Sequence, residues 1–587
     1  MQKWDLTYFY PSDDAWEKDY EILESMINHF ETFQGKLNEF DTFKAYHLYE
    51  EKFITLLYKV YPYAHLGSDL NLKDSVKGNQ NQRVGLLLSK LGQKTSFVSP
   101  EIISLGEEKV ISWAKNDDFL KAYVFPFEKL FRGQKHVLSE LEEKILANYS
   151  SIRSIPTQLY QSLSIIDRTD EEVTLSNGKK VLVSAASYRA LIEESENPSD
   201  RQLVFEALYK RYKDNKSAFA NTYNLVLQQR AASYKSRNYA SSLEAALDGN
   251  NIPVSVFHNL KDVVYENTDL IKRYINLRKK HLNLETYHTY DRFLKLAKSD
   301  KKYTYAESKE LFFESIKHFT PEFVEKQKSA VADGFVDVLP QDGKRTGAYS
   351  SGFYGHHPFI LLNHNETLDS AFTLAHEAGH SAHTLFSNEA RPMAIADYTI
   401  FVAEIASTFN EHALLDYMLK NVTSKNERIV LLESAIDGIL STFYRQTLFA
   451  TYEYEANKLV EEGKPINADA LSKIMIDLYK HYYDLDIAKE NGKELVWAYI
   501  PHLFHTPFYV YQYATSYSAS LKIYSDIKNN KPHAMENYLG LLKSGGSDYP
   551  VNQAKKAGAD LTTKDTFLAV ITRFKELLDL LEETLKA

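Results

Sequence analysis

Three residues in one short segment have the types and spacing of a metal-dependent hydrolytic site. His376 and His380 are four positions apart, and Glu377 directly follows the first histidine. On an α-helix, positions i and i+4 lie one turn apart on the same face, so both imidazoles can reach one metal ion. Glu377 can then reach a water beside that metal. This H-E-x-x-H pattern is typical of zinc sites in which two histidines bind the metal and the glutamate acts as general base.

The surrounding residues predict a buried helix that would hold these side chains. Apolar or small residues recur at helical spacing over residues 368–386, and Asp369 lies in the first turn, where negative charge is favourable. Two histidines and a glutamate in such a helix would each cost free energy if they were buried without partners. A metal ion supplies the partner, whereas a chance match or a purely structural role leaves that cost unexplained. We therefore predict one Zn²⁺ per chain.

A third metal ligand is expected further along the chain, because catalytic zinc normally has three protein ligands and a water. Cys is absent, so this ligand must be His, Asp or Glu. Glu404 is the preferred candidate, since it lies in an apolar helical run, residues 401–406, where an unpaired carboxylate would be costly. Glu411 follows two turns later and either hydrogen-bonds a ligating histidine or is an ordinary surface residue. His383, nearly a turn beyond His380, suits a supporting role better than direct binding.

The composition argues against several classes of partner. The net charge of −10 on the 587-residue chain makes nucleic acid or an anionic membrane an unfavourable main partner, because both attract basic patches. No run approaches the roughly 20 apolar residues that span a bilayer, and residues 1–21 lack the apolar core of a signal peptide. Absence of Cys suits a reducing compartment, so we expect a cytoplasmic protein.

The remaining sequence predicts a mainly α fold with small β elements. Gly and Pro are scarce, at 22 and 16 residues, which favours long helices with few turns. Residues 171–184 predict a β-hairpin, because Asn177-Gly178 suits the two positive-φ positions of a type I′ turn. A polar boundary follows near residue 197. We expect an N-terminal helical domain at residues 1–197, including the hairpin, and a catalytic domain at residues 198–587.

A glycine-rich segment before the metal-binding helix predicts a small sheet. Residues 348–350 and 359–362 have the composition of short strands. A strand directly before such a helix can offer its edge to an extended peptide, which then pairs through main-chain hydrogen bonds. The alternative is a sheet that only supports the helix.

The motif and its flanks resemble a known family. The segment HEAGHSAH, preceded by PFILLN and TLA and followed by Glu404 in FVAEIASTFNEH, is similar to the oligopeptidase F branch of the thimet oligopeptidase family of zinc peptidases. The resemblance covers most of the chain. It implies that His376, His380 and Glu404 bind zinc and that Glu377 is the catalytic base. It also implies a zincin-like, almost all-α fold, with a deep channel that admits short unstructured peptides and excludes folded proteins.

Residues 500–513 resemble a loop of that family on which a histidine and one or two tyrosines face the zinc and stabilise the oxyanion. The resemblance assigns catalytic roles to His502 and Tyr509 and makes Tyr513 a substrate-binding residue. His505 is an alternative to His502, and packing in an aromatic core is the alternative for each tyrosine. Tyr509 and Tyr513 share a helix face if this segment is helical.

Taken together, these features predict a cytoplasmic zinc oligoendopeptidase that acts on short peptides. One alternative is a zinc exopeptidase, such as a dipeptidyl carboxypeptidase or carboxypeptidase, which needs a fixed cation for the terminal carboxylate. Another is a non-catalytic peptide-binding protein on the same scaffold. The intact Glu377 argues against the second alternative, because a binding protein has no use for a general base.

Overall fold

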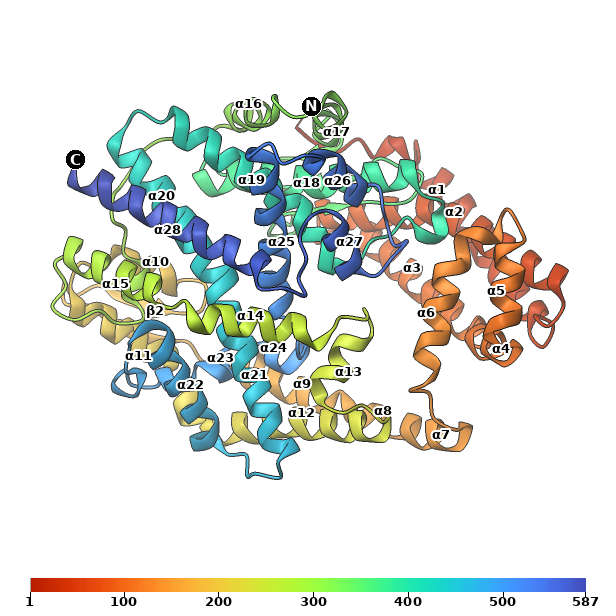
Figure 1. Ribbon diagram of the computed structural model, residues 1–587, viewed down its shortest axis with the longest axis horizontal. Helices are drawn as coiled ribbons and strands as arrows, with labels where there is room; N and C mark the ends of the chain where they lie inside the picture. The colour runs from red at the N-terminus through yellow and green to blue at the C-terminus, as the bar shows by residue number, and fades with distance from the viewer. Residues whose placement is uncertain (1) are drawn as a thin grey trace. The chain divides into compact units, whose positions relative to one another are not determined.

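A computed structural model describes residues 2–587, except for the side chains of residues 140, 150 and 151, and the chain is mainly helical, as predicted (Figure 1). It divides into two compact units, each built from three separate stretches. The first unit consists of Met1–Lys135, Lys301–Lys420 and Ile523–Ala559. The second consists of His136–Asp300, Asn421–Lys522 and Asp560–Ala587.

These units do not follow the linear division expected after residue 197, which falls inside the stretch His136–Asp300. The chain passes between the units after residues 135, 300, 420, 522 and 559, because helices distant in sequence pack together in each unit. The two compact units are therefore interleaved along the sequence. Residues 198–587 as a functional catalytic domain stay a prediction.

The helices of the first unit include the two on which the predicted metal ligands lie, α18 and α19. The helices are α1 (Asp13–Ile27), α2 (Phe40–Leu70), α3 (Ser75–Lys94), α4 (Val98–Leu105), α5 (Glu107–Lys115), α6 (Val124–Gln134), α16 (Tyr305–Ile316), α17 (Pro321–Ala330), α18 (Leu368–Ala390), α19 (Ile400–Asn421), α26 (Ala534–Leu542) and α27 (Pro550–Lys556). Helix α25 (Tyr511–Lys528) begins in the second unit and ends in the first.

The other helices belong to the second unit. They are α7 (Glu140–Asn148), α8 (Ser150–Arg153), α9 (Ile155–Gln161), α10 (Tyr188–Glu194), α11 (Pro198–Asp214), α12 (Lys216–Ser236), α13 (Ser242–Asp248), α14 (Val254–Glu266), α15 (Asp269–His281), α20 (Lys425–Ile439), α21 (Arg445–Glu461), α22 (Ala468–Tyr483), α23 (Val496–Tyr499), α24 (His502–His505) and α28 (Asp565–Lys586).

A three-stranded sheet lies in the first unit, and its two predicted strands are confirmed. Strand β5 (Phe359–Leu361) is central, with β3 (Val336–Asp337) parallel on one side and β4 (Tyr349–Ser351) antiparallel on the other. The core of the unit covers this sheet with aromatic residues from the N-terminal segment. Trp4 Nε1 donates to the Ile360 carbonyl (2.8 Å), and the Phe9 ring stacks on Phe359. The sheet is thereby fixed beside α18.

A β-hairpin of the second unit lies where it was predicted, but its turn is of another type. Strands β1 (Glu171–Thr174) and β2 (Lys180–Val183) pair antiparallel. Gly178 has a φ of 80° and its N–H donates to the Leu175 carbonyl, whereas Asn177 is not in the positive-φ region. The predicted type I′ turn is therefore wrong. Five residues connect the strands, and in a loop of that length one left-handed glycine is enough to close the turn.

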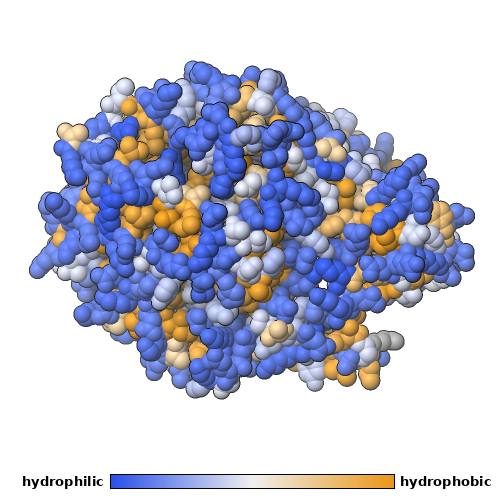
Figure 2. Space-filling model, viewed as in Figure 1, coloured by the Kyte–Doolittle hydropathy of each residue, from blue (hydrophilic) through white to orange (hydrophobic). Residues whose placement is uncertain are grey.

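The molecular surface in Figure 2 is mostly hydrophilic, with hydrophobic side chains in small separate groups. None of the helices among the described residues combines the length and apolar character needed to cross a bilayer.

Candidate active site

Helix α18 places the two motif histidines on one face, as the sequence predicts. It begins after Thr367, whose hydroxyl accepts the Ser370 N–H (3.2 Å), and Asp369 lies in its first turn. An oxygen cap and an acidic first turn both stabilise a helix start. The helix continues to Ala390, one turn beyond the predicted end, so the motif lies near its middle.

Three potential metal ligands converge between α18 and α19. The Nε2 atoms of His376 and His380 lie 3.2 Å apart. Glu404 Oε2 is 3.4 Å from His376 Nε2 and 3.8 Å from His380 Nε2. One ligand atom from each residue thus lies within 4.8 Å of the others. Such a cluster of nitrogen and oxygen atoms has the composition of a three-ligand zinc site.

Gly379 allows α18 and α19 to approach closely enough for this convergence. A Cβ atom at this position would lie 2.5 Å from the Ala406 carbonyl oxygen and 2.6 Å from Ser407 Cα. Those distances are too short for any side chain, and both obstacles are backbone atoms of α19. Glycine is therefore required here, and the close contact that it permits brings Glu404 to the histidines.

Each potential ligand has a further polar partner. His376 Nδ1 donates to Glu411 Oε1 (2.5 Å), and His380 hydrogen-bonds the backbone of Ala403. The Ser407 hydroxyl donates to Glu404 Oε2 (3.0 Å). Contacts of this kind fix the ring orientation and tautomer of metal-binding histidines. Of the two possibilities for Glu411, the structure shows the contact with a motif histidine.

The carboxyl groups change the protonation of the histidines. Burial lowers the pKa of His376, but the bond to Glu411 and the charges of Glu377 and Glu404 outweigh it and raise that pKa to about 9. Burial and the charge of His376 lower the pKa of His380. The carboxyl groups around His376 therefore favour positive charge in this cluster.

Glu377 is a buried carboxyl with unused hydrogen-bonding capacity. Its side chain is 6% exposed, and Oε2 has no hydrogen-bond partner among the described residues. Burial raises its pKa to about 7, an effect opposed by the charge of His376 and by the Ser350 N–H. A general base is most effective when its pKa lies near the working pH. An orphaned buried oxygen beside a set of metal ligands also fits a site that receives water.

A cleft of about 480 Å³ opens beside Glu377. Its lining residues come from the motif helix, from α19, from the segment before β4 and from the segment between β5 and the motif helix. They are Gly347, Ala348, Leu362, Asn363, His364, Asn365, Asp369, Ser370, Phe372, Thr373, His376, Glu377 and Glu411. Because the motif histidine and the free carboxyl both line it, an extended ligand in this cleft would lie against the reactive side chains.

The exposed sheet edge at this cleft belongs to β4. Strand β5, which directly precedes α18, is paired on both sides, so the prediction that its edge is free was wrong. The N–H of Ile360 points to β3, where it bonds the Phe335 carbonyl. Ser350 of β4 pairs with Ile360, and because the N–H of Ile360 points to β3, the N–H and C=O of Ser350 point away from β5. The Ser350 N–H donates to Glu377. The β4 edge thus lies beside the proposed base.

His383 does not support the metal ligands by hydrogen bonding. Its buried ring stacks on Tyr398, with 3.6 Å between ring centroids, and neither ring nitrogen has a hydrogen-bond partner among the described residues. His383 therefore packs against an aromatic ring and does not have the predicted supporting role.

In the second unit, His502 forms a group with two tyrosines. Its Nε2 lies 3.5 Å from the Tyr513 hydroxyl, and its ring is nearly parallel to that of Tyr509, with centroids 6.1 Å apart. Tyr509 and Tyr513 meet edge to face at 5.3 Å. His505 instead packs against Tyr160. Tyr509 precedes α25, so the two tyrosines do not share a helix, and a turn rather than helical spacing brings them together.

Comparison with known proteins identifies the family. The model of peptidase family M3 matches residues 191–572, and the oligopeptidase F model matches residues 101–169. Oligopeptidase PepF of Bacillus subtilis (strain 168) is 35% identical over 99% of this chain and 87% of its own length. Group B oligopeptidase PepB of Streptococcus agalactiae serotype III (strain NEM316) is 33% identical over 99% of this chain and 96% of its own length.

The chain belongs to peptidase family M3.

Solved structures agree with this assignment. Oligoendopeptidase-F from Enterococcus faecium superposes with a TM-score of 0.74 at 29% identity, covering 98% of this chain and 99% of that one. A structure from Chlamydophila abortus gives a TM-score of 0.90 at 33% identity, covering 99% and 98%. The predicted resemblance is confirmed, and this member of family M3 is a metallopeptidase that hydrolyses peptide bonds.

Some residues that shape the site in this family M3 peptidase could not be recognised from the sequence pattern alone. Gly379 was counted only as a small residue on the apolar face, although its position at the helix contact decides where Glu404 lies. A glycine between two metal-ligand candidates on one helix is a signal for close helix packing. The Ser350 N–H contact to Glu377 had no such signal, because it depends on which side of β4 faces outward.

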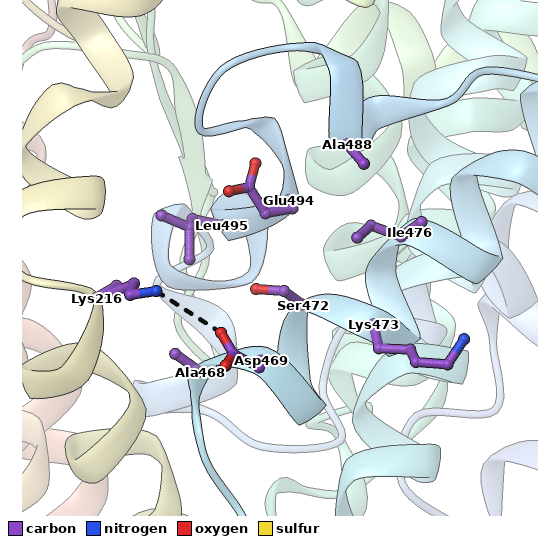
Figure 3. A pocket seen from close by; sticks show the side chains of 9 residues that line it. All are labelled: Lys216, Ala468, Asp469, Ser472, Lys473, Ile476, Ala488, Glu494 and Leu495. Atoms are coloured by element: carbon purple, nitrogen blue, oxygen red, sulfur yellow. Dashed lines mark ion pairs between the residues drawn. The ribbon is translucent and has the colours of Figure 1, made fainter.

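A pocket of about 350 Å³ in the second unit has no comparable group of reactive side chains (Figure 3). Lys216 and Asp469 form an ion pair across it at 3.7 Å, and two alanines, a leucine and an isoleucine complete much of its wall. Its charges neutralise each other, so we assign it no role in the chemistry of this peptidase.

Proposed function

We propose that this family M3 peptidase is a zinc-dependent oligoendopeptidase that cuts internal bonds of short, unstructured peptides in the cytoplasm. The observation that carries the proposal is the convergence of His376, His380 and Glu404 beside the buried carboxyl of Glu377. The relatives named above are oligopeptidases or oligoendopeptidases, which supports the substrate class.

The donor set suits one zinc ion per chain. Two imidazole nitrogens and a carboxylate oxygen form a typical set of protein ligands for catalytic zinc, and no cysteine is available to favour a closed structural site. When bound, zinc supplies a Lewis acid that polarises the scissile carbonyl and lowers the pKa of water. Glu411 and the Ala403 backbone would keep the two imidazoles oriented for that role.

Glu377 acts as the proton carrier in this proposal. Its carboxylate takes a proton from the attacking water and passes it to the leaving amine. Burial raises the pKa of this carboxyl, which helps it to accept the proton before releasing it to the amine. The Ser350 N–H holds the carboxyl beside the cleft while Oε2 stays available for the water.

His502 and Tyr509 would stabilise the negative charge that develops on the scissile carbonyl oxygen. A phenol or an imidazole N–H can donate a hydrogen bond that strengthens as this charge grows. Tyr513 contacts both of them, so it would restrict the His502 ring. Its proposed role is to bind substrate beside these two residues.

The β4 edge would favour the binding of extended peptides. Ala348, directly before β4, lines the cleft, and the backbone groups of Ser350 face away from β5. A peptide that pairs with this edge is read through its main chain, so its side chains influence binding little. Folded proteins do not offer a free extended segment of this kind.

The test is product mapping with short peptides that are blocked at both ends. We expect cleavage at internal bonds, zinc in the purified enzyme and far slower product formation by Glu377→Gln. Activity that requires a free C-terminal carboxylate would instead indicate an exopeptidase. Peptide binding without any cleavage by zinc-loaded wild-type enzyme would indicate a binding protein.

A further inference from the structure

The turn that connects α24 to α25 contains an unfavourable residue at its tightest point. The Tyr509 N–H donates to the Thr506 carbonyl (3.1 Å), which closes a four-residue turn with Pro507 in its second position. Phe508, in the third position, has a φ of 56°. A type II turn requires positive φ there and strongly favours glycine, because a side chain is strained in that conformation. The fold must therefore supply contacts that keep Phe508 in place.

Glu453 of α21 provides the strongest of these contacts. Its carboxyl is 1% exposed, and Oε1 accepts the Phe508 N–H at 2.6 Å. The N–H of this turn position is not used by the closing hydrogen bond of the turn, so it needs another acceptor when buried. The guanidinium of Arg230 lies over the Phe508 ring at 5.1 Å, and Phe257 packs against the same ring. The strained residue is thus held at its backbone and at its ring.

A carboxyl group at this buried position has a high desolvation cost. We therefore expect it to have a role that an apolar side chain could not have. Burial raises the pKa of Glu453 to about 8, although the charge of Arg230 and the Phe508 N–H oppose the shift. An apolar side chain would avoid this desolvation cost, but it could not accept the N–H. Strained backbone that the surroundings hold in place is a common property of functional loops.

We propose that Glu453 is a positioning residue that fixes the turn at Phe508 and thereby keeps His502 and Tyr509 in one arrangement. His502 lies on α24 before the turn, and Tyr509 follows Phe508 directly. A turn that opened at Phe508 would change the distance and angle between these two side chains. This inference rests on the proposed roles of His502 and Tyr509 in the reaction.

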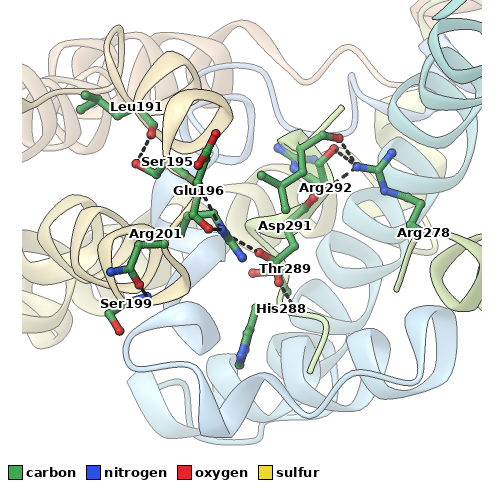
Figure 4. A network of polar contacts seen from close by, with 12 residues as sticks. Leu191, Ser195, Glu196, Ser199, Arg201, Arg278, His288, Thr289, Asp291 and Arg292 are labelled. Atoms are coloured by element: carbon green, nitrogen blue, oxygen red, sulfur yellow. Dashed lines mark hydrogen bonds and ion pairs between the residues drawn. The ribbon is translucent and has the colours of Figure 1, made fainter. Parts of the chain in front are cut away.

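The kinetic test compares two buried glutamates that accept a backbone N–H. Glu490 accepts the N–H of Thr289 at 2.8 Å, and Thr289 lies in a polar network of the same unit (Figure 4). We expect Glu453→Ala to lower kcat by about tenfold to a hundredfold with little change in KM and full zinc content. Glu490→Ala should lower Tm about as much as Glu453→Ala does, but it should leave kcat at the wild-type value. Glu453→Gln should restore most of kcat, because the amide oxygen can accept the same N–H.

Hydrogen exchange tests the turn without reference to catalysis. The Phe508 amide should exchange faster in Glu453→Ala than in wild type and Glu490→Ala, and Glu453→Gln should protect it again. If Glu453→Ala does not yield folded protein, kcat and the exchange of the Phe508 amide are measured in Glu453→Asp, whose carboxyl is one methylene further from the turn. Unchanged exchange at Phe508, or equal losses of kcat in the Glu453 and Glu490 variants, would overturn the inference.

The Tyr509→Phe background separates this inference from the proposed function. If Glu453 acts through Tyr509, Glu453→Ala should reduce kcat much less in that background than in wild type. If Tyr509→Phe is itself fully active, the proposed oxyanion role of Tyr509 is wrong. The exchange measurement at Phe508 still decides whether Glu453 holds the turn.

Discussion

The candidate metal ligands of the first unit lie on two packed helices, whereas in the second unit His502 precedes a four-residue turn and Tyr509 is the last residue of that turn. Helical spacing and the close contact at Gly379 fix the first group. The second group depends on a strained residue and on a buried acid that holds it. The proposed ligands, which would bind a metal continuously, thus lie on two packed helices, and the groups proposed to act only during the reaction lie on a segment with separate support.

The largest effect is expected for His376→Ala. This substitution removes one ligand and also leaves Glu411 without its imidazole partner, so metal binding and activity should both be lost. Elemental analysis and peptide turnover on the same sample provide the check. Full activity in a metal-free variant would show that the helix-borne group is not a metal site.

The helix contact itself can be tested by Gly379→Ala. The added methyl group would overlap the α19 backbone at 2.5 Å, so the helices must separate, with a cost of about 1–3 kcal/mol or more and weaker metal binding. Gly85→Ala in α3 is the matched control, because a Cβ there meets nothing within 4 Å. That control should be neutral or slightly stabilising in thermal unfolding. Equal behaviour of the two variants would contradict the proposed close contact.

Removal of one hydroxyl group tests the turn-borne group. Tyr509→Phe keeps the ring and its packing, so Tm should change little, while kcat should fall about a hundredfold or more with a small change in KM. Tyr513→Phe and Tyr517→Phe are controls, with a smaller loss expected for Tyr513 and none for Tyr517. An unchanged kcat for Tyr509→Phe would assign this residue to aromatic packing alone.

The last expected effect concerns stability and not activity, and it is a pH dependence that originates at Glu453. Its pKa is raised from an ordinary value of 4.5 to about 8 in the folded protein. The folded state therefore holds the proton over this interval and the unfolded state does not. The contribution to the free energy of unfolding is complete below pH 4.5 and falls as pH rises toward 8, by at most about 1.4 kcal/mol per pH unit.

Urea unfolding at pH 5 and pH 8 measures this contribution. Glu453→Gln cannot ionise, so the wild type should lose more stability than the variant between the two pH values. Equal pH dependence in both proteins would mean that the carboxyl is not desolvated as the structure indicates.

The contrast between the two groups also explains what could be predicted from sequence. The spacing of His376 and His380 and the apolar surroundings of Glu404 reflect helical periodicity, which is a local property of the chain. The approach of the two histidines was predictable for that reason, whereas Glu404 was selected by the need for a third ligand and by family resemblance, and its approach depends on the helix contact at Gly379. The grouping of His502 with Tyr509 came only from family resemblance, because the intervening turn has no periodic pattern.

Other features depend on contacts between distant segments and left no local signal. Each unit contains three separate stretches of the sequence, because helices distant in sequence pack together. A linear boundary after residue 197 does not describe this division. The free edge of β4 depends on strand order, which two short strand patterns do not determine. The support of Phe508 by Glu453 joins residues 55 positions apart, and neither residue type suggests the other.

The most direct test of the account is a combined measurement of zinc content and kcat in Glu377→Gln. The amide keeps the shape of the side chain but cannot accept the proton. We expect about one zinc per chain, as in wild type, and a loss of about 10²–10⁴-fold in kcat. Zinc-loaded Glu377→Gln with near-normal turnover would contradict the assignment of Glu377 as the general base.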